Sequence, residues 1–127
     1  IFVGCNYTDP TTKQPTYNQY FPASTAASDI VAYVVDDPDL LFQMQGDASI
    51  AQTGLGNNVS AVNTAGSTSI GRSRNAVDAS SIATTNSLPL RIVDFVDGPS
   101  STVGDSFTDV IVTYLPLSHA YETALGV

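Results

Sequence analysis

The chain has 127 residues, one cysteine and a formal net charge of −8, from four cations and twelve acids. This length suits one compact domain with one core, so we expect a single domain over residues 1–127. Phosphate binding needs clustered cations, which four cations among twelve acids do not supply, so we predict no nucleic-acid partner. No stretch approaches the roughly 20 apolar residues of a spanning helix, so we predict no membrane partner.

Strand-like runs rich in β-branched and aromatic residues recur along the chain, separated by clusters of Asp, Gly and Pro that are typical of turns. They cover residues 1–5, 17–21, 30–35, 40–45, 88–96 and 110–115. The clearest pair is 30–35 and 40–45, two runs joined by an acidic turn that contains Pro38. The sequence therefore predicts an all-β fold, a β-sandwich or small barrel of about seven or eight short, mostly antiparallel strands with long irregular loops.

The start and the middle of the chain carry two further expectations. Residues 1–4 read like the interior of a strand, so we expect a segment upstream of Ile1. Residues 57–87 are a Gly, Ser, Thr, Asn and Ala tract, and loops of this length are uncommon unless they bind something. The tract is either a set of short irregular strands or a contact arm. We favour the strands, because Ile70 and Val77 can each pack against a sheet edge.

Motifs for catalysis or cofactor binding are weak. Residues 66–73 match the spacing of a phosphate-binding loop, but Arg72 replaces the required lysine, and the flanking residues indicate neither a buried strand before the loop nor a helix after it. The single histidine is His119, and the sequence contains no G-x-S-x-G motif that would supply a nucleophile for it to activate. We therefore predict a chain that is not an enzyme, with no catalytic residue and no cofactor.

Metal and thiol chemistry are also weakly indicated. Four acids lie near one turn, and they are either calcium ligands or acceptors for the backbone amides of that turn: Asp36, Asp37, Asp39 and Asp47. We favour the second interpretation, since no glycine-centred loop with a closing glutamate follows. We predict no metal site, and a buried free thiol at Cys5.

Six short motifs, in order along most of the chain, carry a family resemblance. They read Phe2-Val3-Gly4-Cys5, Tyr20-Phe21-Pro22-Ala23-Ser24, Val31-Ala32-Tyr33-Val34-Val35-Asp36-Asp37-Pro38, Phe42-Gln43-Met44-Gln45, Gly66-Ser67-Thr68 and Leu88-Pro89-Leu90-Arg91-Ile92. Together they resemble small virion proteins of tailed bacteriophages that are described as capsid decoration, or cement, proteins. The matching residues belong to strands and turns, and no catalytic residue comes with them.

This resemblance implies a non-enzymatic protein on the outer surface of the capsid. Its partner would be the major capsid protein, whose neighbouring subunits it would bridge to stabilise the head. A homo-oligomer, dimer or trimer, is expected at the capsid symmetry axes. The low charged fraction of 13% fits such a role, because a neutral polar surface loses less hydration when a partner covers it.

For contacts with the capsid or between subunits we select the aromatic and arginine side chains that lie in polar or loop contexts. They are Tyr17, Tyr20, Phe21, Arg72, Arg74 and Tyr121. Alternatives remain open, because Tyr20 and Phe21 also suit a core and Arg74 also suits an internal pair with Asp78.

A second function class is a carbohydrate-binding or host-adhesion module of a phage. It would present Tyr7, Tyr17 and Tyr33 on one exposed face for stacking against sugar rings. The absence of tryptophan makes this class the less favoured one.

Overall fold

The computed structural model describes residues 1–115, which contain nine β-strands, two 3-10 turns and no α-helix. The strands pair antiparallel, which confirms the predicted all-β class. The chain divides into two compact units: the first comprises Ile1–Asp36 and Ala65–Arg74, and the second comprises Asp37–Thr64 and Asn75–Val127. A single domain over residues 1–127 stays a prediction. No helix among the described residues is long and apolar enough to cross a membrane.

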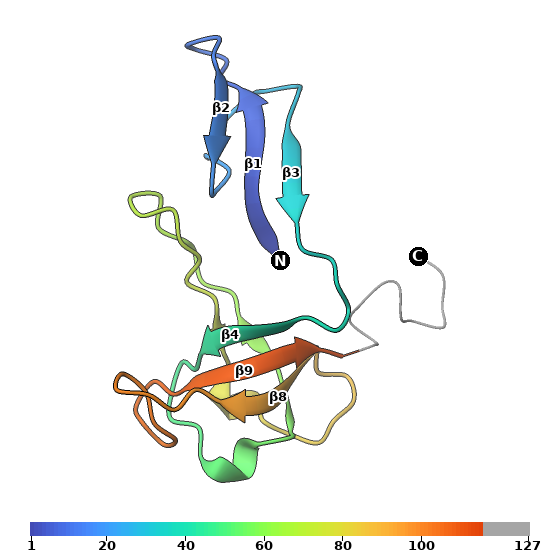
Figure 1. Cartoon of the computed structure of the whole chain (residues 1–127), viewed down its shortest axis with the longest axis vertical. Helices are drawn as coiled ribbons and strands as arrows, with labels where there is room; N and C mark the ends of the chain where they lie inside the picture. Colours follow the sequence, from blue (N-terminus) through green and yellow to red (C-terminus); the bar gives the residue numbers. More distant parts are fainter. Residues whose placement is uncertain (116–127) are drawn as a thin grey trace. The chain divides into compact units, whose positions relative to one another are not determined.

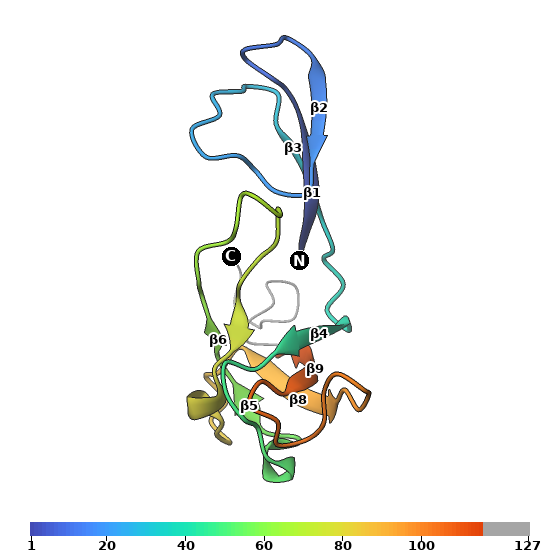
Figure 2. The same ribbon diagram turned by 90° about the vertical axis from the view of Figure 1, so that its left-hand side faces the viewer.

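The first unit contains one three-stranded sheet, with β1 (Phe2–Thr8) between β2 (Pro15–Asn18) and β3 (Val31–Val34) (Figure 1). Paired residues share a face of an antiparallel sheet, so the register assigns each side chain to a side. The loop over residues 19–30 projects to one side of this sheet (Figure 2).

The face covered by that loop holds the small core of the first unit. Cys5 and Tyr7 are buried there, and the Tyr7 ring packs edge-on against Phe21 with centroids 5.9 Å apart. The thiol of Cys5 donates to the carbonyl oxygen of Tyr20 at 3.7 Å. The predicted buried free thiol is confirmed.

A carboxylate fastens the end of this loop to the sheet. Asp29, just before β3, accepts hydrogen bonds from the Thr8 amide at 3.0 and 3.1 Å and from the Thr8 hydroxyl at 2.5 Å. These bonds hold the pKa of the Asp29 carboxyl below its usual range, the hydroxyl contributing most.

The second unit contains the larger core. A four-stranded sheet runs in the order β4 (Leu41–Gln45), β9 (Asp109–Tyr114), β8 (Leu90–Phe95) and β5 (Asn58–Val59), and β6 (Ala61–Val62) pairs with β7 (Ala76–Val77). Alternating side chains of these strands point to one face, where burial is most complete. That core consists of Ile50, Val59, Val77, Leu90, Ile92, Phe95, Val110 and Val112.

The tract 57–87 resolves into short strands and one excursion. Its two ends form β5, β6, β7 and the 3-10 turn Ala79–Ser81 in the second unit, whereas Ala65–Arg74 belongs to the first unit. Val77 is buried, as predicted, but Ile70 is 63% exposed, so the prediction that it packs against a sheet edge is wrong. An isolated apolar residue at the tip of a polar loop has no sheet face to join.

Candidate contact surface

One face of the first-unit sheet is not covered by any other segment of the first unit. We call it the open face, and it carries Gly4, Asn6, Tyr17, Val31 and Tyr33. Tyr17, Val31 and Tyr33 are all exposed, at 55%, 54% and 45%. Aromatic and branched side chains on an exposed sheet face are typical of a binding surface.

Two tyrosines on the open face are held by their neighbours. The phenol of Tyr17 lies over Gly4, so closely that a Cβ at position 4 would stand 2.5 Å from its hydroxyl oxygen. On the other side of β1, the Asn6 amide donates to the Tyr33 hydroxyl at 2.7 Å. The glycine thus makes room for one ring while the asparagine orients the other. Tyr7 lies on the covered face, so the grouping of Tyr7 with Tyr17 and Tyr33 on one exposed face is wrong, and the alternation of β1 is the reason.

The strongest apolar run of the sequence, residues 30–35, lies in this unit and is exposed throughout. Ile30, Val31, Tyr33, Val34 and Val35 are between 39% and 60% exposed. Both faces of β3 contribute, because Val31 and Tyr33 point to the open face and Val34 to the opposite one. The run therefore adds a long apolar edge to the open face.

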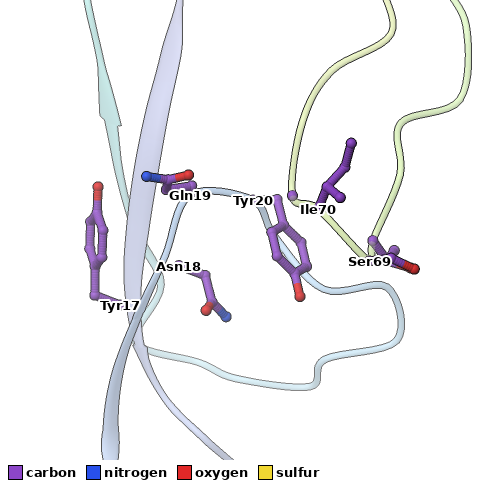
Figure 3. Close-up of a pocket in the computed structure, with 8 residues that line it drawn as sticks. Tyr17, Asn18, Gln19, Tyr20, Ser69 and Ile70 are labelled. Atoms are coloured by element: carbon purple, nitrogen blue, oxygen red, sulfur yellow. The ribbon is translucent and has the colours of Figure 1, made fainter.

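The excursion Ala65–Arg74 brings a second chemistry to the same unit. Its tip closes through Ser67 and Arg72, which pair across a turn, and through the Gly71 amide, which donates to the Ser67 carbonyl at 2.8 Å. Residues 17–20 and 68–71 line a shallow open pocket of about 400 Å³. Figure 3 shows the Tyr20 ring beside Ile70 and Ser69, with Tyr17 on the other side of β1.

Charge divides unequally between the two units. The first unit has three acids and three cations, and a formal charge of zero: Asp9, Asp29, Asp36, Lys13, Arg72 and Arg74. The second unit has nine acids and one cation, Arg91, and so it carries the whole net charge of −8. Covering the first unit with a partner therefore involves little unfavourable net charge.

Five of the six predicted contact residues belong to the first unit: Tyr17, Tyr20, Phe21, Arg72 and Arg74. Tyr17, Phe21 and both arginines are exposed, and Tyr20 is partly buried. The alternative that Tyr20 and Phe21 serve a core holds in part, since Phe21 contacts Tyr7 and Tyr20 lies against Gly71. Tyr121 lies outside the described residues, as does His119. An Arg74–Asp78 pair would join the two units and stays a prediction.

The acidic turn is held by its own backbone. The Asp37 carboxylate accepts from the Asp39 amide at 2.9 Å, which is the capping role expected for a short acid in a turn. Among residues 1–115 no three His, Cys, Asp or Glu side chains are grouped so that they could hold a metal ion. Residues 66–73 form a tight turn, without the preceding strand and following helix that a phosphate-binding loop requires.

Three residues of this surface were not selected from the sequence. Gly4 and Gly71 give space to Tyr17 and Tyr20, and Asn6 orients Tyr33. A glycine inside a strand pattern signals a close approach, so Gly4 was detectable in principle. Comparison with models of protein families, with curated proteins and with solved structures found no match.

Proposed function

We propose that this chain is a non-enzymatic virion structural protein, a decoration or cement protein that binds the outer surface of a phage capsid and bridges major capsid subunits. The observation that carries the proposal is the first unit itself. It is formally neutral, and it presents an apolar strand, two exposed tyrosines and two arginines.

These side chains suit binding by area. Aromatic residues and arginine are enriched at protein interfaces, and a neutral unit can approach a charged shell of either sign without a net repulsion. The acidic, cation-poor chain suits the outside of a shell whose interior holds DNA. Many copies on a lattice need only modest affinity at each site, because each bridge between subunits is multivalent.

The choice of a capsid as the partner is supported by the resemblance of the strand and turn motifs to capsid decoration proteins. Those motifs include Phe2-Val3-Gly4-Cys5 and the run that forms β3, both of which belong to the exposed sheet of the first unit. These two motifs therefore lie in the unit that carries the proposed contact surface.

Cryo-electron microscopy of expanded phage heads with and without the purified chain tests the proposal. We expect added density that bridges neighbouring capsid subunits at symmetry axes. We also expect heads that carry the chain to withstand a higher temperature before they break open than heads without it. Unexpanded heads serve as the control for the state of the shell. Bare heads at saturating concentrations of the chain would overturn the proposal.

A second candidate is a carbohydrate-binding or host-adhesion module, and one observation favours it. Tyr17 and Tyr33 share the open face across Gly4, with the Asn6 amide beside them, which is an arrangement that can stack on a sugar ring and bond its hydroxyls. A glycan array separates the two classes. Binding that Tyr17→Ala abolishes, together with bare heads, would favour adhesion.

A further inference from the structure

Among residues 1–115, the outer edge of β3 is an unpaired strand edge. In the sheet order β2-β1-β3 the strand has β1 on one side, and no described strand lies on the other. An edge of this kind exposes a row of backbone amides and carbonyls that can pair with another strand.

The two edges of the first-unit sheet differ in how they are protected. β2 begins with Pro15 and continues with polar residues, both of which discourage pairing. Residues 30–35 contain no proline, no charge and no bulge on their own strand. Proteins usually protect an edge that must stay unpaired, and β3, although only four residues long, lacks proline, charge and a bulge, which points to an edge that is used.

Hydrogen bonds at the end of β3 show which backbone groups face outward. Val35 and Ile1 exchange two bonds, the Val35 amide donating to the Ile1 carbonyl and the Ile1 amine donating to the Val35 carbonyl, each at 2.8 Å. Groups alternate along an antiparallel strand, so those of Val34 and Ala32 point away from β1. They form the outer half of the ladder, with which no backbone group of the described part of the chain pairs.

We propose that β3 pairs antiparallel with β3 of a second copy of this chain, about a twofold axis that passes between the two Tyr33 residues. In this register Tyr33 faces its own copy, Val31 faces Val35 of the second copy, and Ala32 faces Val34 of the second copy. Every cross-strand pair is aromatic or aliphatic, which is the combination that stabilises a sheet. The two three-stranded sheets become one continuous sheet of six strands.

The exposed area agrees with a reversible dimer. Five side chains that are 39–60% exposed, at roughly 150 to 250 Å² each, present on the order of 400 Å² of apolar surface. A standard interface buries about 800 Å² on each partner, so even complete burial of these side chains would supply only about half of one, which favours a weak, reversible dimer. The first unit is formally neutral, so the pairing brings no net charges together.

A twofold pairing closes on itself and gives dimers, not trimers or fibres. It uses the β3 edge, and it leaves Tyr17, Tyr20, Arg72 and Arg74 available for other contacts. The inference does not depend on the proposed capsid role, since it concerns the purified chain alone.

Disulfide trapping tests the register. In the proposed pairing the two Tyr33 Cα atoms form a non-hydrogen-bonded pair about 4.5 Å apart, within the range that a disulfide bridges. We expect Tyr33→Cys to form a covalent dimer when oxidised glutathione accepts the two electrons of the thiol pair. Val34→Cys is the matched control, because the two copies of residue 34 are offset by roughly 7 Å along the strands and do not crosslink. Equal trapping of both variants would overturn the register, and the unsubstituted chain, with Cys5 buried, measures the background.

Sedimentation velocity from about 1 μM to about 1 mM tests the dimer itself, in a range where an edge of this size should dissociate. We expect the unsubstituted chain to shift from monomer to dimer as its concentration rises. Val34→Lys places a charge on the edge and should weaken the dimer at least tenfold. Ile70→Lys adds the same charge at an exposed site of the same unit and should leave the dimer intact. A chain that is monomeric at every concentration, or a dimer that Val34→Lys leaves unchanged, would overturn the proposal.

Discussion

Gly71 lies against the ring of Tyr20, so closely that a Cβ at position 71 would stand 2.7 Å from Cδ1 of the ring. The backbone of Gly71 is left-handed, with φ +62°, a conformation that glycine adopts without strain. This contact fixes the tip of the excursion Ala65–Arg74 beside the loop that carries Tyr20.

Gly71→Ala should detach this tip. The left-handed backbone alone costs an alanine about 1 kcal/mol, and the clash with the Tyr20 ring adds to that. We expect faster amide exchange across residues 65–74 in hydrogen-exchange mass spectrometry. Gly56→Ala is the control, because Gly56 has φ +77° but open space around a Cβ. If both variants left exchange in 65–74 unchanged, the contact would have no role in holding the tip.

Ile92→Ala should destabilise the core of the second unit. Ile92 is fully buried, and replacing such a residue with alanine costs about 2 to 5 kcal/mol. Its neighbour Val93 is 42% exposed, so we expect Val93→Ala to change stability by no more than about 0.5 kcal/mol. Urea unfolding followed by circular dichroism compares the two. Equal losses would mean that β8 does not bury Ile92 in the way described.

Thr108 links two backbone groups in the interior. Its buried hydroxyl accepts from the Ile50 amide at 3.0 Å and donates to the Asp105 carbonyl at 2.9 Å. Thr108→Val keeps the shape but leaves the Ile50 amide unsatisfied, so we expect a loss of about 1 to 3 kcal/mol. Thr108→Ser keeps the hydroxyl and should restore part of that loss in the same unfolding measurement. A valine variant as stable as the parent would show that the hydroxyl is dispensable.

The bond between Asp29 and Thr8 should be sensitive to acid. The pKa of Asp29 is lowered in the folded chain by the Thr8 hydroxyl and amide, so the folded state favours the carboxylate. Its contribution to stability is therefore complete above the unfolded pKa, about 4, and is lost as the pH falls through the lower folded pKa.

We expect Asp29→Asn to be less stable than the parent at neutral pH and to differ little from it at about pH 2. The pKa of Asp9 is lowered as well, chiefly by the amides of Thr12 and Thr11, so the parent loses additional stability in acid for that reason. The difference between parent and variant isolates Asp29. A difference that does not change with pH would contradict the assignment.

Arg72 and Arg74 should contribute to capsid binding through charge. Replacing both with glutamine is expected to weaken binding to expanded heads about tenfold, at about 0.7 kcal/mol for each charge, and to reduce its salt dependence. Arg91→Gln is the control, because Arg91 belongs to the second unit, where its Nε donates to Asn58. An unchanged binding curve for the double variant would remove both arginines from the proposed contact.

Sequence patterns predicted most of the strands of this fold. Residues 30–35, 40–45, 88–96 and 110–115 contain β3, β4, β8 and most of β9, because β-branched runs bounded by Asp, Gly and Pro leave few other local conformations. Residues 17–21 overlap only the end of β2, where Pro15 and Thr16 carry no apolar signal.

Pairing and burial were harder to predict. The acidic turn at Asp37 joins two strands that belong to different sheets, since β3 pairs with β1 and β4 with β9. A short turn between two strand-like runs does not itself specify that the two strands pair. The run 30–35 has the composition of a buried strand, but its side chains are exposed, and within residues 1–115 it pairs with β1 alone. Apolar composition indicates that a strand becomes buried. It does not indicate whether the residues that bury it belong to the same chain or to a partner.

The contact residues were likewise predictable one by one, but not as a group. Arg72 and Arg74 were found because cations are scarce in this chain, and Tyr17 because it lies in a polar context. Their grouping in one unit depends on the excursion Ala65–Arg74, whose return to residues distant in sequence leaves no local signal.

The discontinuity of the first unit also sets an order of events on the ribosome. Residues 1–36 emerge first and contain all three strands of the sheet, yet the segment that packs against Tyr20 is made only after Asp37–Thr64. At about 5 to 20 residues per second, synthesis leaves the first unit without this segment for several seconds. During that interval the ring of Tyr20 lacks its contact with Gly71, so the nascent chain exposes this ring in addition to the β3 edge.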